Sequence, residues 1–115
     1  MADSALLIGW NRSFAGREQQ AMKLFMKTTE YYNQLQNDGK IENFEPVLLE
    51  GHGGDLNGFV LIRGDSAKLD EIKREETFIS YSIEANFCLQ NFGIIKCVVG
   101  DGITNVFSQW STHFS

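Results

Sequence analysis

The hydrophobic pattern opens with an unbroken apolar run from Ala5 to Trp10, which has the length of a strand buried on both faces. In the longer segment from Arg17 to Gln36, apolar residues recur every three or four positions. That spacing predicts an amphipathic helix, and Asn37-Asp38-Gly39 supplies a stop at which glycine can take left-handed backbone angles. The chain therefore begins with a central strand and a long helix.

Two further apolar runs face each other across a glycine-rich connector. Ile41 to Leu49 and Gly58 to Arg63 are predicted to pair as strands, with Glu50 to Asn57 as the tip of their hairpin. Pro46 lies inside the first of these strands and cannot donate to a strand ladder. We therefore expect that strand at a sheet edge or at a bend.

The second half of the chain predicts a helix, an ambiguous segment, a strand and a short terminal helix. Asp65 or Ser66 can cap the helix. Glu76 to Glu84 alternates as a strand would, yet it also fits helical spacing, so the pattern leaves both structures open. Phe87 to Val99 predicts the fourth strand, with a break at Asn91 to Gly93. Gly100-Asp101-Gly102 predicts a turn, and apolar residues three and four apart between Ile103 and Trp110 predict the last helix.

The order strand, helix, strand, strand, helix, strand predicts an α+β fold, a ferredoxin-like βαββαβ sandwich with an antiparallel sheet and an extra C-terminal helix. We expect residues 1–115 to form one domain. Right-handed crossovers place both helices on one face of the sheet. Because several strands are apolar at consecutive positions, the other face is also apolar, and pairing two such faces about a twofold axis would cover both. The pattern thus predicts a homodimer.

Charge and termini narrow the classes of partner. The chain carries 10 Lys and Arg against 15 Asp and Glu, a net charge of −5, which gives little attraction to nucleic acid. No basic region precedes an apolar one at the start, and no run approaches a membrane span. We expect a cytoplasmic protein that binds neither nucleic acid nor membrane. Cys88 and Cys97 lack the spacing of a metal or redox site, so we expect buried free thiols.

Several segments carry a resemblance to known proteins: G-W-x-R from Gly9, G-R-E-Q-Q-A from Gly16, F-E-P-V-L-L-E-x-H-G-G-D-L-N-G-F from Phe44, and V-V-G-D-G-I near the end. With the element order, they resemble the dimeric α+β barrel superfamily of ferredoxin-like proteins, and more closely a group of small uncharacterised bacterial proteins. The resemblance implies the fold, dimerisation and a helix at Glu76 to Glu84. It implies no activity and no site residues.

The hairpin tip holds the first candidate site. His52 and Asp55 are a histidine and a carboxylate held close together by a glycine-rich loop, and Asn57 flanks them. Histidine titrates near neutrality and a carboxylate can orient it, so the pair is predicted to be catalytic, with Asn57 contacting the ligand. In the alternative interpretation, Asp, Asn and glycine build the turn and His52 is exposed or bonded to a carbonyl.

A cavity between sheet and helix is the second candidate site. We expect aromatic and cationic residues to line it and to bind a small aromatic or acidic ligand, namely Trp10, Arg12, Tyr32 and Arg63. The alternative is that the aromatic residues fill the core. The loop lacks the further glycine of a dinucleotide motif and the lysine of a P-loop, so no nucleotide cofactor is expected. No metal is expected either, because His113 is the only imidazole besides His52.

The function predicted from these features is a homodimer that binds a small organic molecule or acts on it without a tightly held cofactor. A different class stays open beside it. In that alternative the chain is a non-catalytic interaction or regulatory module, and its hairpin loop contacts another protein.

Overall fold

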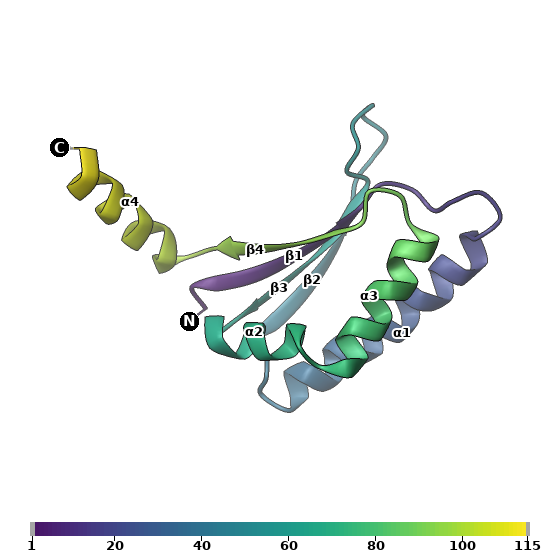
Figure 1. Ribbon diagram of the computed structural model, residues 1–115, viewed down its shortest axis with the longest axis horizontal. Helices are drawn as coiled ribbons and strands as arrows, with labels where there is room; N and C mark the ends of the chain where they lie inside the picture. The colour runs from purple at the N-terminus through teal and green to yellow at the C-terminus, as the bar shows by residue number, and fades with distance from the viewer. Residues whose placement is uncertain (1, 115) are drawn as a thin grey trace.

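The computed structural model describes residues 2–114, which form a four-stranded antiparallel sheet and four helices. The elements are β1 (Ser4–Trp10), α1 (Glu18–Asn37), β2 (Asn43–Leu48), β3 (Gly58–Gly64), α2 (Ser66–Lys73), α3 (Glu76–Cys88), β4 (Gly93–Val98) and α4 (Asp101–Phe114). The strand order is β2-β3-β1-β4, and α1, α2 and α3 lie on one side of the sheet while α4 projects away from it (Figure 1). The predicted ferredoxin-like fold is confirmed.

β1 lies between β3 and β4, as its apolar run predicts. Leu6 and Ile8 are buried beneath the helices, with 0% and 5% of their surface exposed. Because side chains alternate along a strand, Leu7 points to the opposite face, where it is paired with Leu61 of β3 and Ile95 of β4. The sheet therefore has an apolar layer on each face, and only one of them is covered by helices.

The edge position predicted for the proline strand is confirmed, because β2 pairs only with β3. Pro46 lies opposite Val60. The strand starts later than the sequence pattern indicated: Ile41 belongs to the buried core, and Glu42 donates its backbone N–H to the Arg63 carbonyl at 2.8 Å before the strand begins. Burial of Ile41 thus anchors the chain ahead of the edge strand.

The helices begin and end with standard local chemistry. α1 stops where Gly39 adopts φ 74° and Lys40 donates its N–H to the Leu35 carbonyl at 2.9 Å. Asp65 caps α2, accepting a hydrogen bond from the Lys68 N–H at 3.2 Å. Within residues 2–114, no helix combines the length and the hydropathy that crossing a membrane requires.

α3 corrects the predicted start of the fourth strand. The segment Glu76 to Glu84 is helical, but the helix continues to Cys88, so the first residues of the predicted strand from Phe87 to Val99 belong to α3. The reason is a contact made by Arg17, whose guanidinium donates to the Phe87 carbonyl at 2.6 Å and lies over the Phe87 ring at 3.7 Å. This contact satisfies a carbonyl at the end of the helix, and β4 begins only at Gly93.

The thiols differ from the prediction in part. Cys88 is buried and free, and burial raises the pKa of its thiol. Cys97 is also free but only partly buried, since it lies on β4 next to Ala5 on the face that no helix covers.

Candidate functional site

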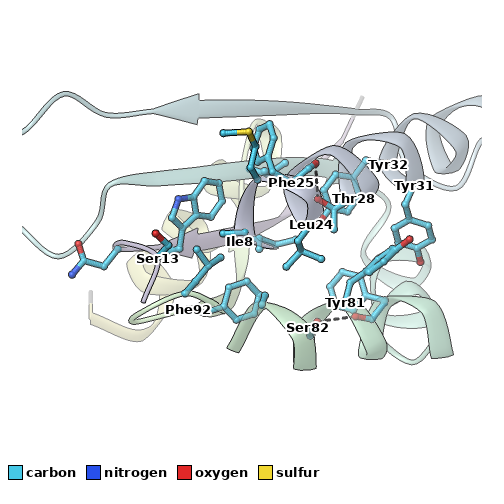
Figure 2. Close-up of a pocket in the computed structure, with 18 of the residues that line it drawn as sticks. Ile8, Ser13, Leu24, Phe25, Thr28, Tyr31, Tyr32, Tyr81, Ser82 and Phe92 are labelled. Carbon is cyan, nitrogen blue, oxygen red and sulfur yellow. Dashed lines mark hydrogen bonds between the residues drawn. The ribbon is translucent and has the colours of Figure 1, made fainter. Parts of the chain in front are cut away.

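A cavity of about 310 Å³ lies between the sheet and the pair α1 and α3. β1 and β3 contribute its floor, and the two helices contribute its walls (Figure 2). Its lining is mostly aromatic and aliphatic, formed by Ile8, Trp10, Asn11, Ser13, Ala21, Met22, Leu24, Phe25, Thr28, Tyr31, Tyr32, Leu48, Val60, Phe78, Tyr81, Ser82, Ala85, Leu89 and Phe92. Among the described residues, those that line it carry no charged side chain.

Three tyrosines form one end of the cavity. Tyr31 meets Tyr32 at 5.8 Å between ring centroids and Tyr81 at 5.6 Å, the latter edge to face. Figure 2 shows Tyr31 and Tyr81 together at this end and Ser13 at the other. Burial is the main cause that raises the pKa of both Tyr31 and Tyr32 well above the ordinary value, and for Tyr31 the nearby Glu75 adds to it. Both hydroxyls therefore stay protonated at neutral pH.

Glu75 lies in the turn before α3, outside the cavity lining, and contacts Tyr31 there. The Tyr31 hydroxyl donates to Glu75 Oε1 at 2.7 Å, and Lys40 Nζ lies 3.3 Å from Glu75 Oε2. A half-buried carboxylate thus connects a cavity tyrosine to a lysine on the surface.

Trp10 lies across the backbone of Gly58, its partner on β3. A Cβ atom added to Gly58 would lie 2.7 Å from the indole ring, so only glycine leaves room for this orientation. Phe25 packs edge to face against the same indole, with ring centroids 6.2 Å apart. Trp10, the last residue of β1, therefore packs between Gly58 of β3 and Phe25 of α1.

The cavity opens where α1 passes the end of β2. Met22 and Leu48 line the cavity, yet 67% and 73% of their surfaces are exposed. Residues that line the cavity and are also this exposed lie at its opening to solvent. Its rim is apolar and, at Met22, flexible.

Two of the residues predicted to bind a ligand line the cavity, namely Trp10 and Tyr32. Arg63 does not, because it alternates with the buried Ile62 and faces the uncovered side of the sheet, where it donates to Asn43 Oδ1 at 3.2 Å and lies 3.7 Å from Glu45. The expectation that Arg63 lines the cavity is corrected by strand alternation.

Arg12 and Asn57 are also absent from the lining. Arg12 is exposed in the loop after β1, and its backbone carbonyl accepts a hydrogen bond from the Gln90 N–H at 2.7 Å. Asn57 donates its side-chain amide to Asn11 Oδ1 and its backbone N–H to the Trp10 carbonyl at 2.9 Å. Asn57 thus holds the hairpin against the end of β1, while its neighbour Asn11 reaches the cavity.

His52 and Asp55 lie in the exposed hairpin tip, outside the cavity lining. The Gly54 N–H donates to His52 Nδ1 at 3.2 Å, and His52 Nε2 lies 2.7 Å from the Leu56 carbonyl. A carbonyl can only accept, so Nε2 carries the proton and Nδ1 is the acceptor. Both ring nitrogens are therefore engaged within the loop, which supports the interpretation that His52 builds the turn; a catalytic role for His52 and Asp55 stays a prediction.

The sequence pattern did not indicate the α3 wall of the cavity, which contributes Phe78, Tyr81, Ser82 and Ala85. The available signal was weak because α3 is apolar on several sides: Phe78 is buried, whereas Ile83 is 67% exposed. No periodic stripe therefore marked the side that faces the sheet. Among the described residues, no group of three or more His, Cys, Asp or Glu side chains could hold a metal ion.

Comparisons with known proteins identify the fold. No family model and no curated protein sequence matches the chain. A dimeric protein of unknown function with a ferredoxin-like fold from Bacteroides fragilis superposes with a TM-score of 0.59 at 9% identity, covering 84% of this chain and 96% of that one. SnoaB, a cofactor-independent oxygenase from Streptomyces nogalater, gives 0.55 at 14% identity, with 86% and 95% covered.

A hydroxynitrile lyase from Passiflora edulis gives a TM-score of 0.65 at 10% identity, and the alignment covers 88% of this chain and 97% of the lyase. At these identities the likeness shows a shared fold. The chain spans nearly the full length of each of these structures.

Proposed function

We propose that this protein binds a small, neutral and largely aromatic molecule in the cavity between the sheet and α1 and α3, and that it works as a homodimer. The observation that carries the ligand class is the lining: about 310 Å³ walled by aromatic and aliphatic side chains, with no charged group among the described residues there. Ligand sites are typically apolar cavities of roughly 300 to 1,000 Å³ with a few polar groups. Trp10 and Tyr32 are the predicted ligand contacts that this proposal keeps.

The comparisons support a small organic ligand, because an oxygenase and a hydroxynitrile lyase share the fold. They do not assign a reaction, since one fold hosts many chemistries. Among the described residues, the cavity lining has neither an imidazole nor a carboxylate. The proposal is therefore one of binding, and activity without a tightly held cofactor stays a prediction.

Filling the cavity tests the site. Ala21 lines the cavity from α1, and Ala67 is exposed on α2 away from it. We expect Ala21→Phe to weaken binding of 2-methoxynaphthalene at least about tenfold by isothermal titration calorimetry, because the new ring occupies the ligand's volume. Ala67→Phe is the matched control and should bind as the wild type does. Unchanged affinity in Ala21→Phe would place the ligand elsewhere.

The homodimer proposal rests on the uncovered sheet face. Register places apolar side chains from all four strands on this face, and 58% of the Ile95 surface is exposed; the set is Leu7, Val47, Phe59, Leu61 and Ile95. Leu56 folds back from the hairpin over Gly9 and extends the set, since a Cβ at Gly9 would lie 3.0 Å from it. A second copy would bury this layer against its own.

The size of the sheet brings α4 into the same interface. The four strands are six or seven residues long. At about 4.8 Å between strands and about 3.3 Å per residue, they present a face on the order of 400 Å², about half of what one partner buries in a standard stable interface. α4 adds a helix of 14 residues with an exposed apolar stripe, formed by Ile103, Phe107, Trp110 and Phe114. We propose that the two α4 helices supply the remaining area by packing on the partner.

A charge on the sheet face tests the dimer. We expect sedimentation equilibrium to give the wild type twice the 13.0 kDa chain mass, and Ile95→Lys to shift it to one chain because an unpaired charge would be buried. Ile83→Lys is the matched control, since Ile83 is at least as exposed as Ile95 but lies on α3. A wild type of one chain mass at micromolar concentration would end the proposal.

A further inference from the structure

Three hydroxyl groups that line the cavity share a property: each has its proton directed to an acceptor in the protein. The Tyr31 hydroxyl donates to Glu75 Oε1 at 2.7 Å. Thr28 Oγ1 donates to the Phe25 carbonyl at 3.0 Å, and Ser82 Oγ donates to the Phe78 carbonyl at 2.8 Å, both drawn as dashed lines in Figure 2. A carboxylate and two carbonyls can only accept, so the direction of all three bonds is fixed.

The cavity therefore offers lone pairs at Tyr31 and Ser82, while the Thr28 hydroxyl also interacts with the Tyr32 hydroxyl. Tyr31 lies on α1, and Ser82 lies on α3 next to Tyr81, so two of the walls present acceptors. Tyr31 is the better of the two, because donation to a charged acceptor polarises the hydroxyl and makes its oxygen more electron-rich. A ligand without a donor would leave these acceptors unsatisfied, at a cost in affinity.

The other polar groups of the lining do not change the preference for a ligand that donates a hydrogen bond. Asn11 and Ser13 lie toward the other end of the cavity, where Figure 2 labels Ser13. Tyr32 and Tyr81 share the tyrosine end, and their hydroxyls can rotate to donate or accept. The fixed acceptors, Tyr31 above all, therefore decide which ligand group fits at that end.

We propose that the cavity selects hydroxylated aromatic molecules over their ether or carbonyl analogues, and that the ligand hydroxyl donates to the Tyr31 oxygen. This rests on the proposed binding function and names the ligand class of that site. Glu75 is a positioning residue: it holds the Tyr31 proton away from the cavity, while Lys40 at 3.3 Å pairs with its other oxygen. Anionic ligands are disfavoured, because they lack a donor and would meet the carboxylate behind Tyr31.

Two probes of one ring system test the selection. We expect isothermal titration calorimetry at pH 7 to show that the wild type binds 2-naphthol about fivefold more tightly than 2-methoxynaphthalene, the effect of one hydrogen bond worth about 1 kcal/mol. Tyr31→Phe should reduce this ratio to about one, because the acceptor for the ligand hydroxyl is lost. Tyr81→Phe, the matched control at the same end, should keep the ratio.

A third probe tests the positioning role of Glu75. Glu75→Gln provides an amide that can donate to the Tyr31 oxygen and turn the Tyr31 proton toward the cavity. We expect this variant to bind 2-acetonaphthone, which only accepts, more tightly than the wild type does, and to lose part of the preference for 2-naphthol. A purely structural role for Glu75 would weaken all three probes together.

The outcomes separate the two proposals. If the wild type binds none of the probes, the proposed binding function fails. If it binds 2-naphthol and 2-methoxynaphthalene equally, or if Tyr31→Phe keeps the ratio and Tyr81→Phe loses it, this inference is overturned while the binding site stands. Circular dichroism and the thermal midpoint of each variant establish that it is folded.

Discussion

His52 shows how one side chain can organise a loop. Its ring connects the Gly54 N–H to the Leu56 carbonyl. Gly53, between His52 and Gly54, adopts φ 81°, a left-handed angle that favours glycine. The hairpin tip is therefore a small closed turn. His52, which the sequence suggested as a catalytic residue, stabilises this turn through its two hydrogen bonds.

Removing the imidazole separates the two interpretations of His52. We expect His52→Ala to leave the affinity for 2-methoxynaphthalene within about twofold, because the ring lies outside the cavity, and to speed amide hydrogen exchange at Gly54 as its acceptor is lost. Stability should fall by less than about 1 kcal/mol, as is usual for an exposed site. Asp55→Ala, the other member of the predicted pair, should likewise leave the affinity for 2-methoxynaphthalene within about twofold. A tenfold loss of affinity in His52→Ala would restore the binding or catalytic role predicted from the sequence.

The face on which a residue lies could be predicted from the sequence only where the register of its strand or helix could also be predicted. Trp10 ends an apolar strand and Tyr32 lies in the helical stripe, so both could be assigned to the interior from the pattern. Arg63 could not be placed, because shifting a strand by one residue exchanges its two faces and the sequence leaves that choice open. The Tyr31 to Glu75 hydrogen bond joins residues 44 positions apart, and no local pattern announces such a contact.

At the scale of elements, α1 and α3 form the pair that encloses the cavity. Lys27 of α1 lies 3.4 Å from Glu84 of α3 on the outside, and Tyr31 contacts Tyr81 on the inside. The outer pair is half exposed and contributes little to stability, so the inner aromatic contacts hold the helices together.

The buried tyrosines make this pairing sensitive to alkali. The pKa of Tyr31 and Tyr32 lies above the ordinary 10.0 in the folded state, so the unfolded chain releases these protons first as pH rises. Their contribution to stability is complete below pH 10 and is lost as pH rises beyond it. We expect the free energy of unfolding in urea to fall from pH 9 to 11, and to fall less in the Tyr31→Phe, Tyr32→Phe double variant. An equal slope in both proteins would contradict this assignment.

The bounds of an element could be predicted where its periodicity was strong and its ends depended on local signals. The predicted α1 differs from the observed helix by one residue at each end, because its apolar stripe and its Gly39 stop are local signals. The end of α3 was missed because it depends on Arg17, which is distant in sequence. The terminal helix was predicted too short, since α4 already begins at Asp101, where the turn was expected.

At the scale of the whole molecule, α4 is joined firmly but covered little. A Cβ at Gly102 would lie 2.6 Å from the Asp3 carbonyl, so the first turn is seated closely against the start of the chain. Beyond it the helix leaves the body, and Phe114 is 85% exposed (Figure 1). A fixed base with an exposed apolar stripe suits a helix that reaches another protomer.

Deleting residues 101–114 tests that role of α4. We expect the truncated protein to keep its affinity for 2-methoxynaphthalene, because α4 contributes no residue to the cavity. We also expect the proposed dimer of the truncated protein to dissociate at concentrations at least about tenfold higher than that of the intact chain. Sedimentation velocity across a dilution series measures the change. An unaltered dimer would mean that the sheet faces suffice by themselves.

Pro46 also limits how copies of this chain can assemble. Its nitrogen has no proton, so the free edge of β2 lacks one of the donors that an added strand would need. Two copies joined through the other edge, β4, would present β2 at both ends of the combined sheet. Strand addition at β2 would leave one acceptor of the added strand unsatisfied, whereas the uncovered face of the sheet stays free to pair with a second copy.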